Sequence, residues 1–342
     1  RLHTGYNSLL LQSLTTQTIR VYSRVWVFNR PKPSSLEIIN ECEMISTFPV
    51  FTPLMRDHRD EVLAVTSTFD PYSDFNFTSL ASWNADHTLS VARLHDNLII
   101  KLPDYTTRQI VYSLMGNKKV EETLHAVLEV TSELKLVPEQ VVRQIKDVRA
   151  FTISEDVDNF DYIYEVERLV TLAGGEFKKK RNKVHQVVHE MGDALGIHHV
   201  GKLRPGDKEI IMHIFDNWAA DCEKARTKEC PKAERKALYS LLYEVESPNL
   251  ITTLVTVHNE VIGFSIHELL GKDQAIVHFE KATLVHKNIY AFLNNGAAIK
   301  LAREGVKYVN WEQDLGLPGL RQAKHSYHPT GFLKKYSIAL SS

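Results

Sequence analysis

Polar side chains recur at every second position of a strand that we predict over residues 307–314, and the last two of them are acidic. Successive residues of a strand point to opposite sides, so four polar side chains share one face: Tyr308, Asn310, Glu312 and Asp314. Carboxylates in such a row can take up and return protons during a reaction. We therefore expect Glu312 and Asp314 to belong to an acid/base site.

Basic side chains follow these acids closely. Arg321 and Lys324 come after Pro318 and Gly319, which favour a sharp turn and predict a loop. Acids at a strand end with bases on the next loop are components of an acid/base site. The alternative is a buried salt-bridge network that ties the C-terminal segment down.

A second predicted strand, over residues 274–282, places an imidazole beside a carboxylate. His278 and Glu280 share one face of this strand, while Lys281 lies on the other. Such groups are costly to bury unless they are paired or face a cavity. Glu280 is therefore a third candidate proton acceptor.

The basic run 178–183 opens a predicted helix. At about 100° per residue, Lys180 and Arg181 lie on the two flanks of the apolar stripe of this helix. A solvated basic face is the alternative, as it is for most charge runs. Because Lys180 and Arg181 lie beside a buried stripe and close to Gly174 and Gly175, they indicate a binding site for a phosphate or carboxylate group. Asn182 would orient this group by hydrogen bonds.

Composition restricts the classes of protein to consider. The 342 residues have a net charge of −1, so no general basic field would hold the chain on DNA. Three cysteines do not make a disulfide framework, and no apolar run approaches the roughly 18 residues of a membrane span. We expect a cytoplasmic protein, with a position at the periphery of the membrane as the alternative. The sequence contains no H-E-x-x-H pattern, and we expect no metal site.

The predicted elements fall into two similar series. In each half, helices precede three strands and another helix follows them. The strands of the first half cover 88–94, 97–102 and 109–115, and those of the second half cover 251–257, 261–268 and 274–282. This order predicts an α+β fold in which one architecture is used twice. We expect an N-terminal arm or linker over 1–44, a first domain over 45–165 and a second domain over 166–342.

Five segments, in order over about residues 45–336, resemble the phosphatidylglycerol lysyltransferase C-terminal-like family. These are Asp161–Tyr164 (DYIY), Leu172–Asn182 (LAGGEFKKKRN), His278–Lys281 (HFEK), Asn310–Gly316 (NWEQDLG) and Gly319–Pro329 (GLRQAKHSYHP). The resemblance implies two tandem GNAT-like (acyl-CoA N-acyltransferase-like) domains, each a mixed sheet flanked by helices. This arrangement is shared with the Fem-type aminoacyltransferases.

The residues and the resemblance together predict an acyl- or aminoacyltransferase. An amine or hydroxyl of the acceptor would attack an activated ester directly. The donor would be aminoacyl-tRNA or acyl-CoA, and the acceptor a small molecule, a peptide or a lipid headgroup. GNAT acetyltransferases carry a Gly-rich loop for the CoA pyrophosphate, whereas residues 284–290 contain no glycine. This difference favours an aminoacyl ester as the donor.

Roles can be assigned to individual residues on this basis. The catalytic residues would be Glu280, Glu312, Asp314 and Lys324, where a carboxylate takes the proton and Lys324 or Arg321 stabilises the oxyanion or a nearby phosphate. The substrate-binding residues would be Lys180, Arg181, Asn182, His278, Lys281, Asn310, Arg321 and Tyr327.

Two other functions fit the same sequence. A non-catalytic GNAT-like module could bind a phosphorylated ligand without turning it over, because fold does not fix function. A CoA-dependent N-acetyltransferase is the second alternative. The first domain offers fewer charged strand positions than the second, so we expect the first domain to be structural.

Overall fold

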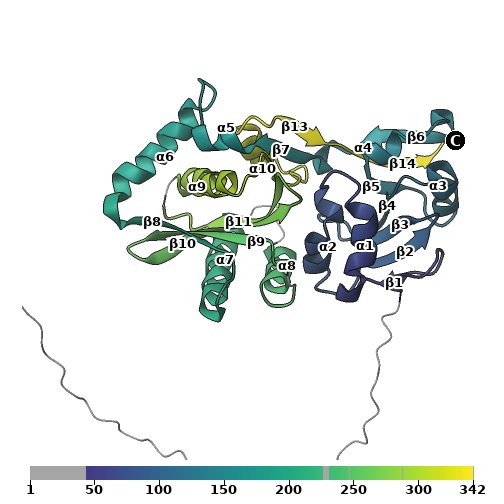
Figure 1. Cartoon of the computed structure of the whole chain (residues 1–342), viewed down its shortest axis with the longest axis horizontal. Helices are drawn as coiled ribbons and strands as arrows, with labels where there is room; N and C mark the ends of the chain where they lie inside the picture. Colours follow the sequence, from purple (N-terminus) through teal and green to yellow (C-terminus); the bar gives the residue numbers. More distant parts are fainter. Residues whose placement is uncertain (1–43, 226–230, 246, 287, 342) are drawn as a thin grey trace, which may run out of the picture. The chain divides into compact units, whose positions relative to one another are not determined.

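The computed structural model describes residues 44–225, 231–245, 247–286 and 288–341. The expected N-terminal arm over 1–44 lies outside the described residues except for Met44. Two seven-stranded sheets organise the described residues, and helices flank both (Figure 1).

The first sheet has the strand order β1-β2-β3-β4-β5-β14-β6. Its strands are β1 (Thr52–Pro53), β2 (Ser90–Leu94), β3 (Asn97–Pro103), β4 (Ile110–Met115), β5 (Leu134–Pro138), β6 (Phe151–Glu155) and β14 (Lys335–Leu340). The helices of this half are α1 (Arg59–Thr66), α2 (Phe77–Trp83), α3 (Val120–Leu128) and α4 (Glu139–Val142). Alternate residues of β3 belong to two cores, since Leu98 and Ile100 pack on one side of the sheet and Ile99 on the other. Both faces of this sheet are therefore covered.

The second sheet has the order β13-β7-β12-β11-β10-β9-β8. Its strands are β7 (Asp161–Glu165), β8 (Leu195–Val200), β9 (Leu250–Val257), β10 (Glu260–Leu270), β11 (Gln274–Ala282), β12 (Tyr308–Asn310) and β13 (Gly331–Leu333). The helices are α5 (Val166–Thr171), α6 (Lys178–Met191), α7 (Pro205–Ala225), α8 (Pro231–Tyr243), α9 (Ile289–Arg303) and α10 (Pro318–His325). Figure 1 shows α6 and α9 on one side of this sheet and α7 and α8 on the other.

Both sheets are built in the same way. Three antiparallel strands, β2 to β4 or β9 to β11, lead into a helix, α3 or α9. The next strand, β5 or β12, then pairs in parallel with the last of the three. This structure confirms the expected α+β fold of two tandem GNAT-like mixed sheets. A two-residue turn, His258-Asn259, joins β9 to β10, and both of its residues have positive φ.

Two strands cross between the halves. β7, which falls within the predicted first domain (45–165), lies in the second sheet. β14, from the C-terminal end of the predicted second domain, lies between β5 and β6 in the first sheet. The side chain of Lys335, at the start of β14, is fully buried and forms ion pairs with Asp74 and with Asp161 of β7, the latter at 2.7 Å. The proposed domain limits at 45, 165 and 342 stay a prediction, and this crossing ties the two halves together.

Two predicted elements near the C-terminus are wrong. The strand predicted over 307–314 ends at Asn310, and Glu312 and Leu315 then adopt left-handed backbone conformations with φ of 55°. Because alternation stops there, the predicted row of four polar side chains on one strand face does not form. The predicted loop after Pro318 is the helix α10, in which Pro318 occupies the first turn, where its missing N–H costs nothing.

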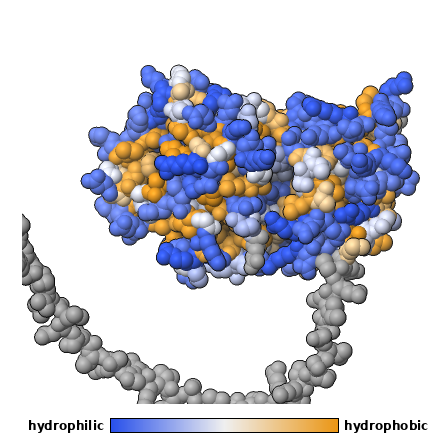
Figure 2. All heavy atoms as spheres, in the orientation of Figure 1, coloured by the Kyte–Doolittle hydropathy of each residue, from blue (hydrophilic) through white to orange (hydrophobic). Residues whose placement is uncertain are grey.

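The surface is mostly hydrophilic in the view of Figure 2, with hydrophobic atoms gathered over α9 and the adjoining sheet.

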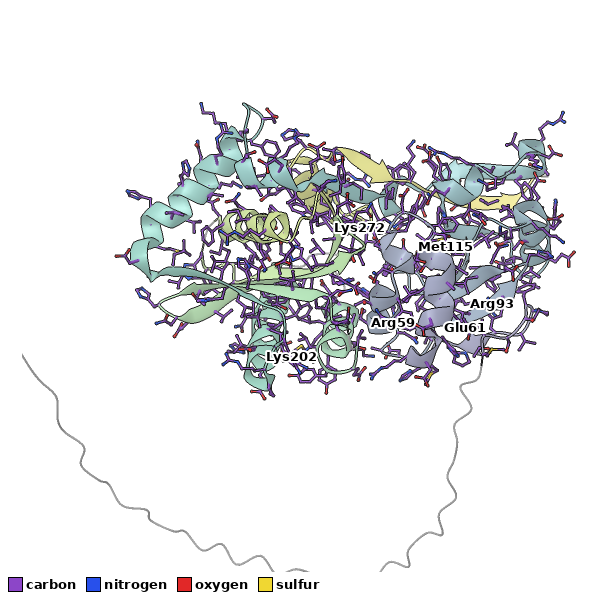
Figure 3. The ribbon with its side chains drawn as sticks, viewed as in Figure 1. Arg59, Glu61, Arg93, Met115, Lys202 and Lys272 are labelled. Carbon is purple, nitrogen blue, oxygen red and sulfur yellow. The ribbon has the colours of Figure 1, made fainter. Side chains whose placement is uncertain are left out.

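On the first sheet, Arg93 of β2 forms an ion pair with Glu61 of α1 at 3.2 Å, and both residues are labelled in Figure 3. Within the described part of the chain, no helix combines the length and apolar character needed to span a bilayer.

Candidate active site

A cavity of about 1210 Å³ opens beside β11. β11 pairs with β12 only over Gln274–Ile276, because β12 ends at Asn310. Residues 277–281 of β11 continue without β12 beside them, and all five line the cavity. The divergence of two parallel neighbours thus creates the space, and the side chains of β11 determine its chemistry.

Seven of the predicted site residues line this cavity: Lys180, His278, Glu280, Lys281, Glu312, Lys324 and Tyr327. They come from α6, β11, the 311–317 turn, α10 and the turn that follows α10. Side chains of the first half, including Ser79, Trp83 and Tyr105, complete the wall. The cavity is therefore built from both halves, and the expected division into a structural and a catalytic domain stays a prediction.

Glu280 is a carboxyl group of the cavity whose pKa lies near neutral pH. Burial raises the pKa of Glu280 to about 7, against the opposing effects of the Lys281 charge, a hydrogen bond with Asn294 and the charges of Lys324 and Lys180. A carboxyl group with this pKa changes protonation state near neutral pH, as a general base requires.

Lys180 supplies a positive charge to the same cavity. Its Nζ lies 3.6 Å from the centre of the Tyr327 ring, a cation–π contact. Burial and the neighbouring Lys183 lower the pKa of Lys180 to about 8, and Glu280 opposes this change. The hydroxyl of Tyr327 accepts a hydrogen bond from Nδ2 of Asn294 at 3.3 Å. The ring of Tyr327 thus holds Lys180 at the cavity wall.

Lys281 also lines the cavity, with its charge already neutralised. Its Nζ lies 2.7 Å from Oε1 of Glu234 and 4.0 Å from the centre of the Trp218 ring. These contacts fix the lysine against α7 and α8.

Lys324 holds the turn that carries Glu312. Its Nζ donates hydrogen bonds to the carbonyl oxygens of Trp311, Glu312 and Gln313 at 2.5, 3.0 and 2.6 Å. All three ammonium hydrogens therefore have acceptors. A left-handed conformation at a residue other than glycine costs about 1 kcal/mol or more, and these bonds stabilise it at Glu312. Burial raises the pKa of Glu312 to about 8, opposed by the charge of Lys324.

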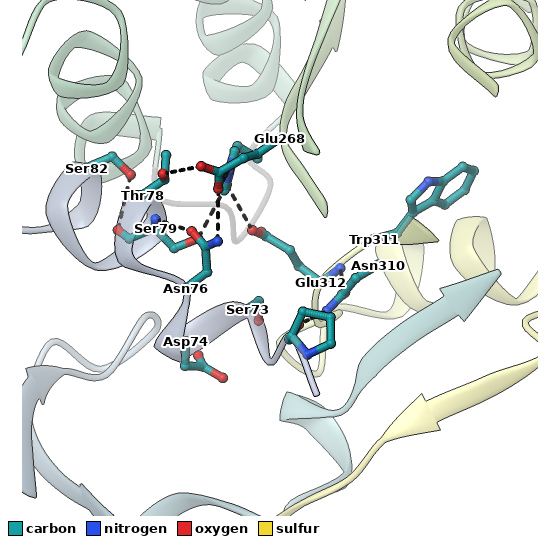
Figure 4. Close-up of polar contacts among 12 residues, drawn as sticks. Ser73, Asp74, Asn76, Thr78, Ser79, Ser82, Glu268, Asn310, Trp311 and Glu312 are labelled. Carbon is teal, nitrogen blue, oxygen red and sulfur yellow. Dashed lines mark hydrogen bonds and ion pairs between the residues drawn. The ribbon is translucent and has the colours of Figure 1, made fainter. Parts of the chain in front are cut away.

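His278 lies in a buried polar cluster that reaches the cavity. Figure 4 shows other members of this cluster, among them Ser79, Glu268 and Glu312. Its Nε2 is 3.2 Å from Oε2 of Glu268, and its Nδ1 is 3.3 Å from Oγ of Ser79 and 3.9 Å from Oε1 of Glu312. The carboxylate of Glu268 also accepts hydrogen bonds from Asn76, at 2.9 Å, and from two hydroxyl groups, those of Thr78 and Ser247, at 2.7 Å each.

Sequence reasoning missed Glu268 and Ser79. A polar pair, His267 and Glu268, at the end of an otherwise apolar strand was the signal available for Glu268. Ser79 carried no such signal, because its partner His278 lies 199 positions away in the sequence.

Two predicted phosphate-binding residues lie outside the cavity wall. Arg181 donates from Nη1 to the carbonyl oxygens of Leu172 and Gly174, the latter at 2.7 Å, and so stabilises the turn before α6. Asn182 is exposed on the next position of the helix. Of the basic run, Lys179, Lys180 and Lys183 border the cavity instead.

Asp314, Arg321 and Asn310 also lie outside the cavity lining. Arg321 donates to both oxygens of Asp314 at 2.8 Å and to Asp158 at 2.6 Å. These bonds and one from Tyr162 lower the pKa of Asp314 despite its burial.

Asn310 has a similar structural environment. Its Nδ2 donates to the carbonyl of Pro71 at 2.8 Å, and its Oδ1 accepts from the backbone N–H of Glu312 at 2.7 Å. The second contact ends the strand and starts the turn. Asp314 and Arg321 thus form a salt-bridge network, which was the alternative to an acid/base site. Glu312 and Lys324 line the cavity instead.

Comparisons with known proteins agree with this architecture. A sequence model of the family described as "Phosphatidylglycerol lysyltransferase, C-terminal" matches residues 66–339. A protein from Mycoplasmoides gallisepticum is 22% identical over 188 residues, covering 54% of this chain and 57% of that protein. The match thus spans a little over half the length of this curated relative.

Solved structures resemble the chain over most of its length. A conserved protein of unknown function from Bacteroides thetaiotaomicron has a TM-score of 0.70 at 26% identity, covering 85% of this chain and 99% of that one. L-PGS from Bacillus licheniformis has a TM-score of 0.55 at 12% identity, covering 82% and 91%. FemX has a TM-score of 0.51 at 9% identity, covering 84% and 96%. The last two likenesses establish the fold alone.

Proposed function

Since the chain belongs to the phosphatidylglycerol lysyltransferase C-terminal family, we propose that it is an acyltransferase of the aminoacyltransferase kind. It moves an acyl or aminoacyl group from an activated ester to an amine or hydroxyl of an acceptor. The reaction takes place in the cavity beside β11. One observation carries the proposal: a carboxyl group, Glu280, with a pKa near 7 shares this cavity with the cation of Lys180.

Glu280 is the proton acceptor in this proposal. An amine or hydroxyl becomes nucleophilic when it loses its proton, and a base with a pKa near the working pH is most effective. Glu312, the other carboxyl group predicted to be catalytic that lines the cavity, has its pKa raised to about 8 and is mostly protonated at neutral pH. Glu280 is therefore the better base of the two.

Lys180 binds an anionic part of the donor or acceptor. A phosphate of a tRNA terminus or of a lipid headgroup would suit its charge. The aromatic side chains of the wall, Trp83, Tyr105 and Trp311, offer flat surfaces for a base or another planar group. The favoured donor is an aminoacyl ester such as aminoacyl-tRNA, as the lack of glycine in residues 284–290 indicates.

A donor panel tests the proposal. Wild-type protein is incubated with labelled aminoacyl-tRNA or labelled acetyl-CoA, each with phosphatidylglycerol vesicles, a peptide amine or a small amine as acceptor. The expected result is label transfer from aminoacyl-tRNA, lost in Glu280→Gln and kept in the exposed control Glu190→Gln. Transfer of label from acetyl-CoA and none from aminoacyl-tRNA would show that the donor is an acyl-CoA. Tight donor binding without transfer to any acceptor would favour a binding module.

A further inference from the structure

The amide side chain of Asn294 is placed next to both titrating groups that the proposed function uses. Asn294 belongs to α9, is 8% exposed and lines the cavity. Its Nδ2 donates a hydrogen bond to the hydroxyl of Tyr327 at 3.3 Å, and the centre of the Tyr327 ring lies 3.6 Å from Nζ of Lys180. One aromatic ring therefore connects Asn294 to the cation of the cavity.

Helix α9 runs antiparallel to β11. Ala282, at the end of β11, shares a hydrophobic cluster with Ile289 in the first turn of α9. Ala275, near the start of β11, shares another cluster with Leu301 near the end of α9. Four helix residues advance about 6 Å and two strand residues about 7 Å. One turn of α9 therefore matches two residues of β11.

This match brings Asn294 to Glu280. The backbone N–H of Ala282 donates a hydrogen bond to the hydroxyl oxygen of Tyr290 at 3.1 Å, which fixes the helix against the strand. Asn294 comes one turn after Tyr290, and Glu280 comes two residues before Ala282, so the two side chains lie opposite each other. The amide of Asn294 forms a hydrogen bond with the carboxyl group of Glu280. Its nitrogen has two hydrogens, and Tyr327 and Glu280 are two acceptors for them.

Other polar side chains at this end of α9 have different partners. Nδ2 of Asn288, directly before the helix, donates to Oε1 of Gln186 at 3.0 Å, and the hydroxyl of Tyr290 is bonded to the backbone of β11. Asn294 is therefore the amide of α9 that is placed to hold Glu280.

We infer that Asn294 is a positioning residue: its amide holds the carboxyl group of Glu280 and, through Tyr327, the ammonium group of Lys180, so that base and cation face the same part of the cavity. This inference rests on the proposed function, in which Glu280 takes the proton of the acceptor and Lys180 binds an anionic group. Asn294 itself carries no charge at any working pH, so it can hold both groups without titrating.

Loss of the amide should change the acidity of Glu280. A hydrogen bond to a carboxylate stabilises the charged form, so its removal raises the pKa of Glu280, by about one pH unit. The other titratable groups remain in such a variant, and the carboxyl group still titrates. The titratable side chains that face Glu280 are Lys180 of α6, Lys281 of β11, Tyr290 of α9, Lys324 of α10 and Tyr327 after α10.

The next residue of the same helix provides a matched control. Nδ2 of Asn295 donates to the carbonyl oxygens of Leu169 and Val170 of α5, at 2.8 and 2.9 Å. Asn295 does not line the cavity. Replacement of either asparagine thus removes two hydrogen bonds from α9, but only those of Asn294 reach the site.

An NMR titration tests the inference without any substrate. The full chain is isotope-labelled in the carboxyl carbons of glutamate, and the Glu280 signal is identified by its absence in Glu280→Gln. We expect the titration midpoint of Glu280 to lie about one pH unit higher in Asn294→Leu than in wild type and to be unchanged in Asn295→Leu. Asn294→Ser, which is too short to reach both acceptors, should also raise the midpoint. It replaces Asn294→Leu if thermal unfolding shows that the leucine variant is not folded.

The transfer assay measures the same positioning in a second way. In Asn294→Leu, the acid limb of the pH–rate profile should move to higher pH by the same amount. The KM for aminoacyl-tRNA should rise about fivefold, because the ring that holds Lys180 has lost its anchor. Asn295→Leu should change neither quantity, although both variants should unfold at a lower temperature than wild type.

The titration decides the inference separately from the proposed function. An unchanged midpoint of Glu280 in a folded Asn294 variant, or an equal change in Asn295→Leu, would overturn the inference. So would transfer by folded Asn294→Leu with the pH profile and KM of wild type, a result that would leave the proposed function intact. A raised midpoint in a protein whose wild type transfers nothing to any acceptor would support the positioning of Glu280 and contradict the proposed transfer.

Discussion

Lys180 and Tyr327 form a cation–π pair in the wall of the cavity, with 3.6 Å between the ammonium nitrogen and the ring centre. The pair joins α6 to the turn that follows α10. It places a cation whose pKa is lowered to about 8 in the same cavity as Glu280, whose pKa is raised to about 7. In the proposed transfer reaction Lys180 is charged and Glu280 is ionised, so the two groups would limit the active pH range from both sides.

The pH dependence of transfer should therefore be bell-shaped. The rate rises through about pH 7 as Glu280 loses its proton and falls above about pH 8 as Lys180 loses its charge. Lys180→Arg keeps its charge and should move the alkaline limb to higher pH, whereas Lys178→Arg, on the exposed first turn of α6, should leave the profile unchanged. A wild-type profile without an alkaline limb would refute this role of Lys180.

The half-buried carboxyl of Glu280 should also make folding stability depend on pH. Its pKa is about 7 in the folded chain against an ordinary 4.5, so the folded state binds the proton more tightly than the unfolded state. This contribution is fully present below pH 4.5 and is lost as the pH rises to 7. Glu280→Gln removes the titration. Relative to wild type, the free energy of unfolding of this variant should increase by roughly 3 kcal/mol from pH 4.5 to pH 8.

Denaturant unfolding at the two pH values measures this difference. Glu190→Gln, an exposed control on α6, should show no such change. A constant difference between Glu280→Gln and wild type at both pH values would show that Glu280 titrates normally.

Lys335 should be essential for stability. Burial opposes its charge, but Asp161 and Asp74 raise the pKa of Lys335 and pair with it where all three side chains are fully buried. Lys335→Met leaves two buried carboxylates without their cation, which costs about 3–5 kcal/mol. Lys334→Met removes an exposed pair with Glu155 and a cation–π contact at 5.8 Å from the Phe160 ring centre, and should cost less than about 1 kcal/mol. Equal unfolding free energies of the two variants would contradict this assignment.

Much of the fold could be predicted from the sequence because local patterns carry it. Each of the antiparallel strands 251–257, 261–268 and 274–282 either alternates apolar with polar residues or is apolar along most of its length. The turn at His258-Asn259 depends on only two adjacent residues. The parallel partners and the crossing of β14 into the first sheet depend on contacts between distant segments. No local pattern indicates them.

The position of side chains was easier to predict on β11 than beyond Asn310, while their roles stay a prediction. His278 and Glu280 lie in a regular strand, so alternation places them correctly. After Asn310 the backbone turns at Glu312, held by Lys324 from a helix that begins six residues later. The turn therefore sends Glu312 to the cavity and leaves Asp314 outside its lining.

Asp314 provides a test of this separation. Its two oxygens are bonded to Arg321, Tyr162 and the N–H of Gly316, so Asp314→Asn should lower the free energy of unfolding by about 1–3 kcal/mol. Transfer per folded molecule should stay within about threefold of wild type at a temperature where the variant is folded. A hundredfold loss of the transfer rate in a fully folded Asp314→Asn variant would restore the catalytic role predicted from the sequence.

The central claim is that Glu280 takes the acceptor's proton in the cavity beside β11. The most direct measurement is the single-turnover rate constant for aminoacyl transfer by wild type and Glu280→Gln at pH 7.5, with saturating donor and acceptor. Loss of a general base predicts a decrease of about 100- to 10,000-fold, with donor affinity nearly unchanged. Equal rate constants for the two proteins would contradict the account.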